Sequence, residues 1–131
     1  MAVNIGLVGF GTVGKGFVRA LGMNRELIER HAGTELRLLR IADLDIDRDR
    51  GVDLCGAELC RDAFSVLEDP NLDIIIELIG GVDLSRKFIL TALRNGKHVV
   101  TANKALLAEH GDELFGAADQ AGKAIYFEGA V

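Results

Sequence analysis

The stretch that decides the fold is Gly9-Phe10-Gly11-Thr12-Val13-Gly14, a G-x-G-x-x-G pattern near the start of the chain. The apolar run over residues 3–8 predicts a strand in front of it, and apolar residues at helical spacing over residues 13–30 predict a helix behind it. Glycines at this spacing in a strand-to-helix turn are typical of a turn that holds a phosphate group. The alternative is a tight turn that binds no ligand.

We expect the residues of this turn to have different roles. Gly9 permits the tight turn, Gly11 lets the backbone approach a pyrophosphate, and Gly14 allows the helix to pack closely on the strand. The free amides of Thr12, Val13 and Gly14 would face the phosphate at the positive end of the helix. We therefore expect the whole six-residue turn to contact a dinucleotide cofactor.

Strand and helix patterns alternate along the rest of the chain. Apolar runs predict strands over residues 36–42, 72–79, 98–101 and 124–128, and helical patterns cover residues 61–68, 83–95 and 109–120. We expect Asp83 to cap its helix and the charged residues 43–51 to form a mobile loop. Such alternation implies right-handed crossovers. The expected fold is therefore α/β, a Rossmann-like doubly wound parallel sheet in a single domain over residues 1–131, with its ligand at the carboxyl ends of the strands.

Composition narrows the class of protein. A net charge of −5 argues against a nucleic-acid partner, which would need a basic face. No apolar run approaches the roughly 20 residues that span a bilayer, and no secretory signal is visible, so we expect no membrane partner and a cytoplasmic protein. Cys55 and Cys60 are expected to be ordinary thiols in a reducing compartment. His31, His98 and His110 are expected at the surface or in packing roles.

An acidic residue is expected after the second strand, where it would bind the adenosine ribose. Asp43 stands there, although it also suits a plain turn. Leu44 follows it instead of an arginine, which favours NAD. Arg40, Arg48 and Arg50 lie nearby and would suit a 2′-phosphate, so NADP stays open as the alternative cofactor.

The second half of the chain carries a specific resemblance. Its motifs are Glu77-Leu78-Ile79-Gly80-Gly81, then Gly96-Lys97-His98-Val99-Val100-Thr101-Ala102-Asn103-Lys104, and last Phe127-Glu128-Gly129-Ala130-Val131. Together with the opening G-F-G-T-V-G, they resemble the N-terminal domain of homoserine dehydrogenases over nearly the whole chain. The resemblance implies NAD(P)-dependent interconversion of homoserine and aspartate 4-semialdehyde, a step toward threonine and methionine.

The resemblance also implies roles for single residues. Bare backbone at Gly80 and Gly81 would let a ribose lie close, although the pair also suits a strand-terminating turn. Thr101 and Asn103 would hydrogen-bond the nicotinamide ribose. Lys104 would lie near the nicotinamide and the substrate as the catalytic candidate, holding a polarised oxygen or relaying a proton. Without the resemblance, a lysine on a loop is usually a solvated charge.

A monovalent cation is the last implied ligand. Glu128 and the backbone carbonyl of Val131 match positions that in this family help to hold such an ion, commonly sodium. Glu128 on its own would be read as a carboxylate at a strand end.

The family's enzymes continue with a substrate-binding and dimerising region. We therefore expect a cofactor domain that binds dinucleotide with negligible turnover alone, and a parent enzyme that is a homodimer or homotetramer. Two alternatives stay open at this point. One is the cofactor domain of another NAD(P)-dependent dehydrogenase, and the other is a non-enzymatic module that senses NAD(H).

Overall fold

The computed structural model describes residues 2–45, 51, 53–54 and 56–127. Six parallel strands form one sheet in the order β3-β2-β1-β4-β5-β6. Their bounds are β1 Ala2–Val8, β2 Glu35–Ala42, β3 Glu58–Cys60, β4 Ile74–Glu77, β5 His98–Thr101 and β6 Ile125–Phe127. This order confirms the expected doubly wound parallel sheet.

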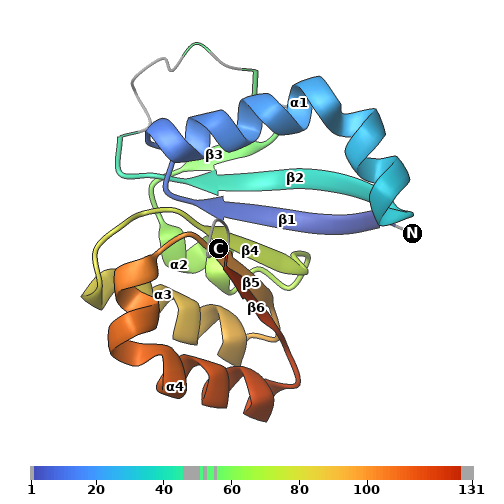
Figure 1. Cartoon of the computed structure of the whole chain (residues 1–131). Coiled ribbons are helices and arrows are strands. Elements are labelled where there is room, and N and C mark those ends of the chain that lie inside the picture. The colour runs from blue at the N-terminus through green and yellow to red at the C-terminus, as the bar shows by residue number, and fades with distance from the viewer. Residues whose placement is uncertain (1, 46–50, 52, 55, 128–131) are drawn as a thin grey trace.

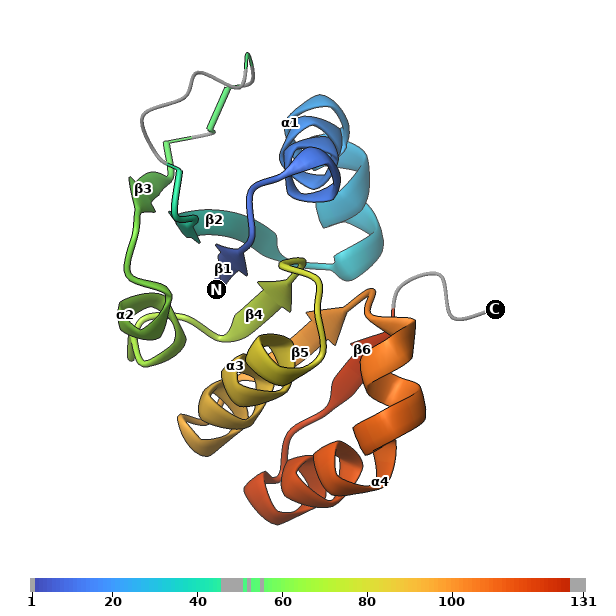
Figure 2. The same cartoon turned by 90° about the vertical axis from the view of Figure 1, so that its left-hand side faces the viewer.

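Helices cover both faces of the sheet (Figures 1 and 2). The connection from β1 to β2 is α1, Thr12–Ala32, which lies on one face. The other face carries α2 Ala63–Leu67, α3 Asp83–Arg94 and α4 Lys104–Ala121. The helix that follows β1 lies on one face of the sheet, and the helix that follows β4 lies on the other face. The topological switch point, where ligands bind in such sheets, therefore lies between these two strands.

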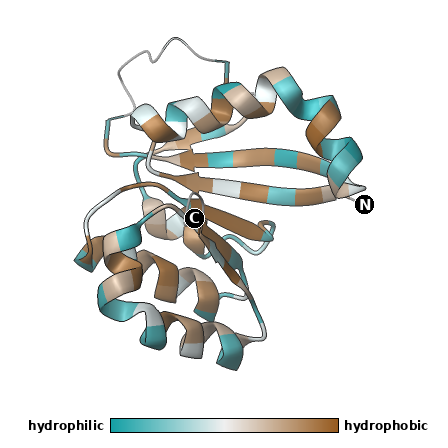
Figure 3. Cartoon of the chain, viewed as in Figure 1, coloured by the Kyte–Doolittle hydropathy of each residue, from teal (hydrophilic) through white to brown (hydrophobic). Residues whose placement is uncertain are grey.

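The core has two layers because side chains alternate across the strands. Ile74 and Ile76 pack toward α1, whereas Ile75 packs with the helices of the other face. Figure 3 shows the resulting apolar character of β4, which fits a central strand covered on both faces. Glu77, the last residue of β4, is the exception after three isoleucines.

An ion pair joins two of the helices on the shared face. The guanidinium of Arg86 on α3 lies 2.5 Å from a carboxylate oxygen of Glu113 on α4. The hydrogen bond from Arg86 holds the pKa of the Glu113 carboxyl below its ordinary value. Both side chains are partly exposed, so water screens the pair.

Several elements differ from the predictions. The last helix begins at Lys104 and not at residue 109, because Asn103 caps it, and non-helical torsions at His110 mark a kink inside it. The short strand β3 was not predicted. Asp83 does not cap α3, since Val82 occupies that position and Asp83 lies in the first turn. The predicted mobile loop falls largely on residues 46–50, which lie outside the described residues.

Within the described part of the chain, no helix combines the length and the apolar character needed to cross a bilayer.

Candidate functional site

The glycine turn lies at the carboxyl end of β1, between β2 and β4. The amide of Gly9 donates to the carbonyl of Ala42 at 2.9 Å, and the amide of Leu78 donates to the carbonyl of Val8 at 2.8 Å. The turn is therefore joined to both neighbouring strands at the switch point of the sheet.

Two of the glycines are required by close approach of the backbone. Gly9 has φ +100°, and a Cβ there would lie 2.7 Å from the amide nitrogen of Ile79. A Cβ on Gly14 would lie 2.2 Å from the carbonyl oxygen of Gly9. Gly11 differs from both, because a Cβ there would meet nothing within 4 Å. Packing of the domain explains Gly9 and Gly14, whereas the space beside Gly11 is left open.

The N-terminus of α1 is open to an anion. Gly11 is its N-cap, and among the described residues no side chain caps this end and no acidic residue lies in the first turn. The first helical hydrogen bond runs from Lys15 to the carbonyl of Gly11 at 2.8 Å, which leaves the amides of Thr12 and Val13 pointing out of the helix. Exposed amides at the positive end of a long helix can bind a phosphate group.

Asp43 holds the glycine turn through its carboxylate. One oxygen accepts from the amide of Phe10 at 2.7 Å, and the other accepts from the amide of Asp45 at 2.9 Å. The ring of Phe10 is buried among apolar residues beneath α1. Any contact of Phe10 with a cofactor would therefore involve its backbone, and its side chain serves the core.

A cleft of about 340 Å³ lies beside the turn on the β2 side. Its lining residues are Val8, Gly9, Gly11, Ala42, Asp43, Leu44, Arg61, Ala63, Leu78, Ile79, Leu84 and Phe88. The lining joins the Asp43 carboxylate to apolar side chains, a combination typical of small-molecule sites. Arg61, which no sequence pattern singled out, also lines this cleft because it follows the unpredicted strand β3.

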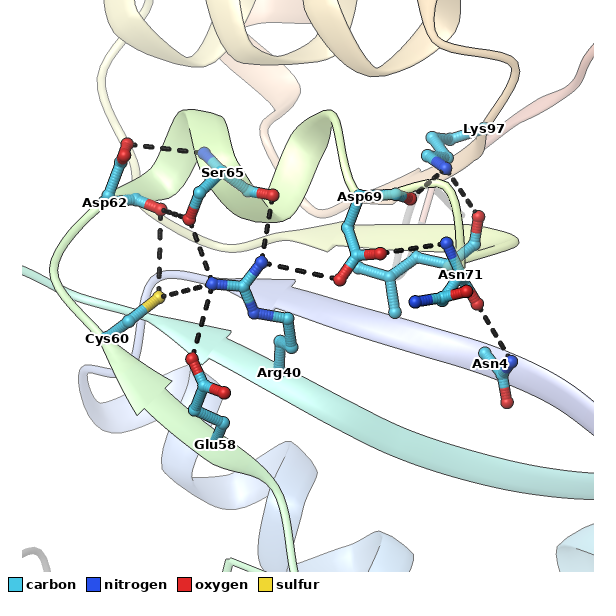
Figure 4. Close-up of polar contacts among 10 residues, drawn as sticks. Asn4, Arg40, Glu58, Cys60, Asp62, Ser65, Asp69, Asn71 and Lys97 are labelled. Atoms are coloured by element: carbon cyan, nitrogen blue, oxygen red, sulfur yellow. Dashed lines mark hydrogen bonds and ion pairs between the residues drawn. The ribbon is translucent and has the colours of Figure 1, made fainter.

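Arg40 is engaged elsewhere (Figure 4). Its guanidinium donates to the carbonyl and the hydroxyl of Ser65, both at 3.0 Å, and lies 3.4 Å from Asp69 and 3.5 Å from Glu58. It does not line the cleft beside Asp43. The suggestion that Arg40 holds a 2′-phosphate is therefore wrong, while Arg48 and Arg50 lie outside the described residues.

A second cleft of about 280 Å³ lies on the β5 side of the turn. Its lining residues are Val13, Glu77, Leu78, Gly80, Ala102, Asn103 and Lys104. Gly80 and Gly81 have φ +78° and +77°, a left-handed backbone that favours glycine. Lys104 is the first residue of α4, and its exposed side chain stands at the mouth of the cleft.

The side chains of Thr101 and Asn103 lie differently from the prediction. Thr101 is fully buried, and its hydroxyl donates to Glu77 at 2.7 Å, so it does not face a ribose in the cleft. Asn103 lines the cleft, but its side chain also accepts from the amide of Leu106 at 3.0 Å and donates to the carbonyl of Gly81. Of these two residues, Asn103 is therefore the one placed to contact a ligand there.

The remaining candidate residues either serve the packing of the fold or lie outside the described residues. Nδ1 of His98 accepts from the amide of Ala124 at 3.1 Å, which links β5 to β6. Glu128 and Val131 fall outside the described residues, so the structure does not place the expected cation site. The described histidines, cysteine and acidic residues form no cluster able to hold a metal ion.

Comparison with known proteins shows the family to which the chain belongs. Residues 9–128 match the family described as "Homoserine dehydrogenase, NAD binding domain". The chain belongs to this family. Among curated homoserine dehydrogenases, those of Bacillus subtilis and Neisseria gonorrhoeae are 38% and 42% identical to it, over 99% and 98% of the chain. The match covers only 30% and 29% of those two proteins, so the chain spans about a third of their length.

Solved homoserine dehydrogenases share the fold. That of Thiobacillus denitrificans superposes with a TM-score of 0.92 at 44% identity, covering 100% of this chain and 30% of the other. One from S. aureus gives a TM-score of 0.88 at 38% identity, covering 97% and 32%. The expected membership in the homoserine dehydrogenase family is thereby confirmed over the two alternatives, another dehydrogenase and a sensing module.

Proposed function

We propose that residues 1–131 form a domain that binds NAD or NADP across the carboxyl end of its sheet. The parent enzyme would interconvert homoserine and aspartate 4-semialdehyde by hydride transfer. The observation that supports this most directly is the open helix end at Gly11, flanked by two clefts, in a member of this family. Phosphates bind such helix ends through backbone amides.

The two clefts differ in a way that orients the dinucleotide. The cleft at Asp43 is apolar with one carboxylate, which suits an adenine and the hydroxyls of its ribose. The cleft at Asn103 and Lys104 then takes the nicotinamide end, and Gly80 offers it bare backbone. A carboxylate at the ribose repels a 2′-phosphate, whereas Arg61 in the same cleft attracts one, so both cofactors stay within the proposal.

Lys104 is the proposed catalytic residue of this domain. When bound, the nicotinamide supplies the hydride acceptor or donor. The ammonium of Lys104 at the mouth of the second cleft would hold the substrate oxygen as its charge changes. The side chain is exposed on this domain, so a bound cofactor and substrate would have to provide the desolvation that strengthens this contact.

Further parts of the proposal concern the whole enzyme. It would be a homodimer or homotetramer of the cytoplasm, with no nucleic-acid or membrane partner, acting on a small-molecule substrate. The free thiol of Cys60 suits a reducing compartment. Glu128 and the carbonyl of Val131 would contribute to a sodium site.

Titration of the chain with NADH and NADPH, followed by the nicotinamide fluorescence, tests the proposal. We expect saturable binding that the Gly11→Ala variant weakens by about tenfold or more, since the methyl group enters the space that the phosphate needs. The free energy of unfolding should fall by no more than about 1 kcal/mol, because the methyl group meets no protein atom and alanine is only the poorer N-cap residue. A chain that takes up neither dinucleotide would contradict the proposal.

A further inference from the structure

The second cleft contains a buried carboxylate that the proposed catalysis does not use. Glu77 at the end of β4 is 1% exposed, although every other residue of that strand is isoleucine. Burying a charged group costs free energy unless hydrogen bonds compensate for it. An isoleucine or a leucine would continue the core, so the carboxylate needs a separate explanation.

Three donors compensate the charge of Glu77, and they come from three elements. One carboxylate oxygen accepts from the amide of Ile79, just after β4, at 2.8 Å. The other accepts from the hydroxyl of Ser85 on α3 at 2.5 Å and from that of Thr101 on β5 at 2.7 Å. The bonds to Ile79 and Ser85 lie on either side of the Gly80-Gly81 turn, so the carboxylate closes the base of this turn.

The same network continues from Thr101 to the start of α4. Oγ1 of Thr101 accepts from the amide of Asn103 at 3.2 Å. The side chain of Asn103 reaches back to the carbonyl of Gly81 and caps α4 through the amide of Leu106. The network therefore joins the two loops that form the walls of the second cleft, and it ends directly before Lys104.

From this closed network we infer that Glu77 is a positioning residue for the nicotinamide end of the cofactor. Its carboxylate fixes the Gly80-Gly81 turn against the loop before Lys104, and so it sets the shape of the second cleft. The inference rests on the proposed cofactor function and adds to it a residue that acts through Thr101 and Asn103. Glu77 is not among the residues that line the first cleft around Asp43, although it accepts from the backbone amide of Ile79, which does line it. We therefore expect the smaller effect at the first cleft.

A comparison of NADH with ADP-ribose isolates the contribution of the nicotinamide ring. ADP-ribose contains the adenosine, the pyrophosphate and a second ribose, but no nicotinamide. In the Glu77→Gln variant we expect NADH affinity to fall by about tenfold or more, while ADP-ribose affinity changes less than about threefold. The variant has one acceptor oxygen in place of two, so it cannot accept from Ile79 and from both hydroxyls together, and the turn loses part of its fixed base. The fluorescence enhancement of bound NADH should fall in parallel.

Matched variants distinguish positioning from general stability. Thr101→Val keeps the shape and removes the link to Asn103, so it should lower the NADH-to-ADP-ribose affinity ratio even if Glu77→Gln fails to fold. Asp69 pairs with Arg40 and lines neither cleft, so Asp69→Asn is the matched control. It should leave the ratio of NADH affinity to ADP-ribose affinity unchanged.

The possible outcomes separate this inference from the proposed function. Equal losses of NADH and ADP-ribose affinity in the variants would show a merely structural role and overturn the inference. The inference would also be overturned if the unchanged chain bound NADH no more tightly than ADP-ribose, because the nicotinamide would then add no affinity for Glu77 to support. If it bound neither compound, the proposed function itself would fail.

Discussion

At the scale of single residues, one glycine pattern combines two different requirements. Gly9 and Gly14 are glycines because neighbouring backbone would collide with a Cβ, whereas the space beside Gly11 is open. The spacing predicted separate tasks for the three glycines, but it did not predict that a Cβ on Gly9 would meet the backbone of Ile79, which follows β4. The burial of Thr101 was not predictable for the same reason, since its partner Glu77 is 24 residues away along the chain.

We expect Gly14→Ala to lower the free energy of unfolding by about 1–3 kcal/mol, the usual cost of overpacking. The new Cβ would lie 2.2 Å from the carbonyl oxygen of Gly9, so the helix or the turn must move. Urea denaturation measures the change. Gly16→Ala on the same helix is the control, because its Cβ meets nothing within 4 Å and alanine should stabilise the helix by up to about 1 kcal/mol. Equal effects of the two substitutions would remove the steric explanation.

Asp43→Ser tests the ribose assignment. We expect the affinity for NAD to fall by about tenfold and that for NADP to fall less, because a 2′-phosphate no longer faces a carboxylate. Competition titrations with both dinucleotides give the ratio of affinities. Some loss common to both is expected, since the carboxylate also holds the amide of Phe10. An unchanged ratio would mean that Asp43 only shapes the turn.

At the scale of elements, strong local signals were predictable and weak ones were not. The long apolar periodicity of α1 and its end before Gly33 follow from the sequence, and the structure places Gly33 in the left-handed C-cap. The strand β3 has only three residues, too few for a period to show. The helix α4 was predicted to start too late, because Asn103 was assigned to ligand binding and not to the cap that it forms.

Asn103 should therefore show two separable roles. Asn103→Ala removes the cap of α4 and should lower the free energy of unfolding by about 1 kcal/mol. Asn103→Asp keeps the capping oxygen and restores most of that stability, but it loses the donor to Gly81. We expect NADH affinity to fall in both variants, measured by fluorescence titration. Glu29→Ala, which removes the acceptor of the Leu36 amide away from both clefts, should lower stability alone.

At the scale of the whole molecule, apolar alternation was enough to predict the sheet and its layers. Polar contacts between distant segments were not predictable, since no local pattern marks which partners meet. Lys97 is the clearest case (Figure 4), because it lies inside a family-like motif yet serves the core. Its side chain is 3% exposed, and its ammonium donates to the carbonyls of Asp69 and Leu72, which ties the start of β5 to the loop before β4.

Replacing Lys97 should change both the stability and its pH dependence. Lys97→Met leaves the buried carbonyl of Leu72 without the amine that it bonds, so we expect a loss of about 1.5–3 kcal/mol at neutral pH. Burial lowers the pKa of Lys97 from its ordinary value of 10.5, and the charges of Asp69 and Asp73 only partly oppose this effect.

Between the lowered pKa and 10.5 the unfolded chain binds a proton at Lys97 that the folded chain has released, so folding stability gains from rising pH in that window. Urea denaturation at about pH 8 and about pH 10 should therefore show a larger difference between the unchanged chain and Lys97→Met at the higher pH. Lys87→Met, at an exposed lysine of α3, is the control and should show no such growth. A difference that shrinks with pH would mean that pairing with Asp69 and Asp73, and not burial, dominates at Lys97.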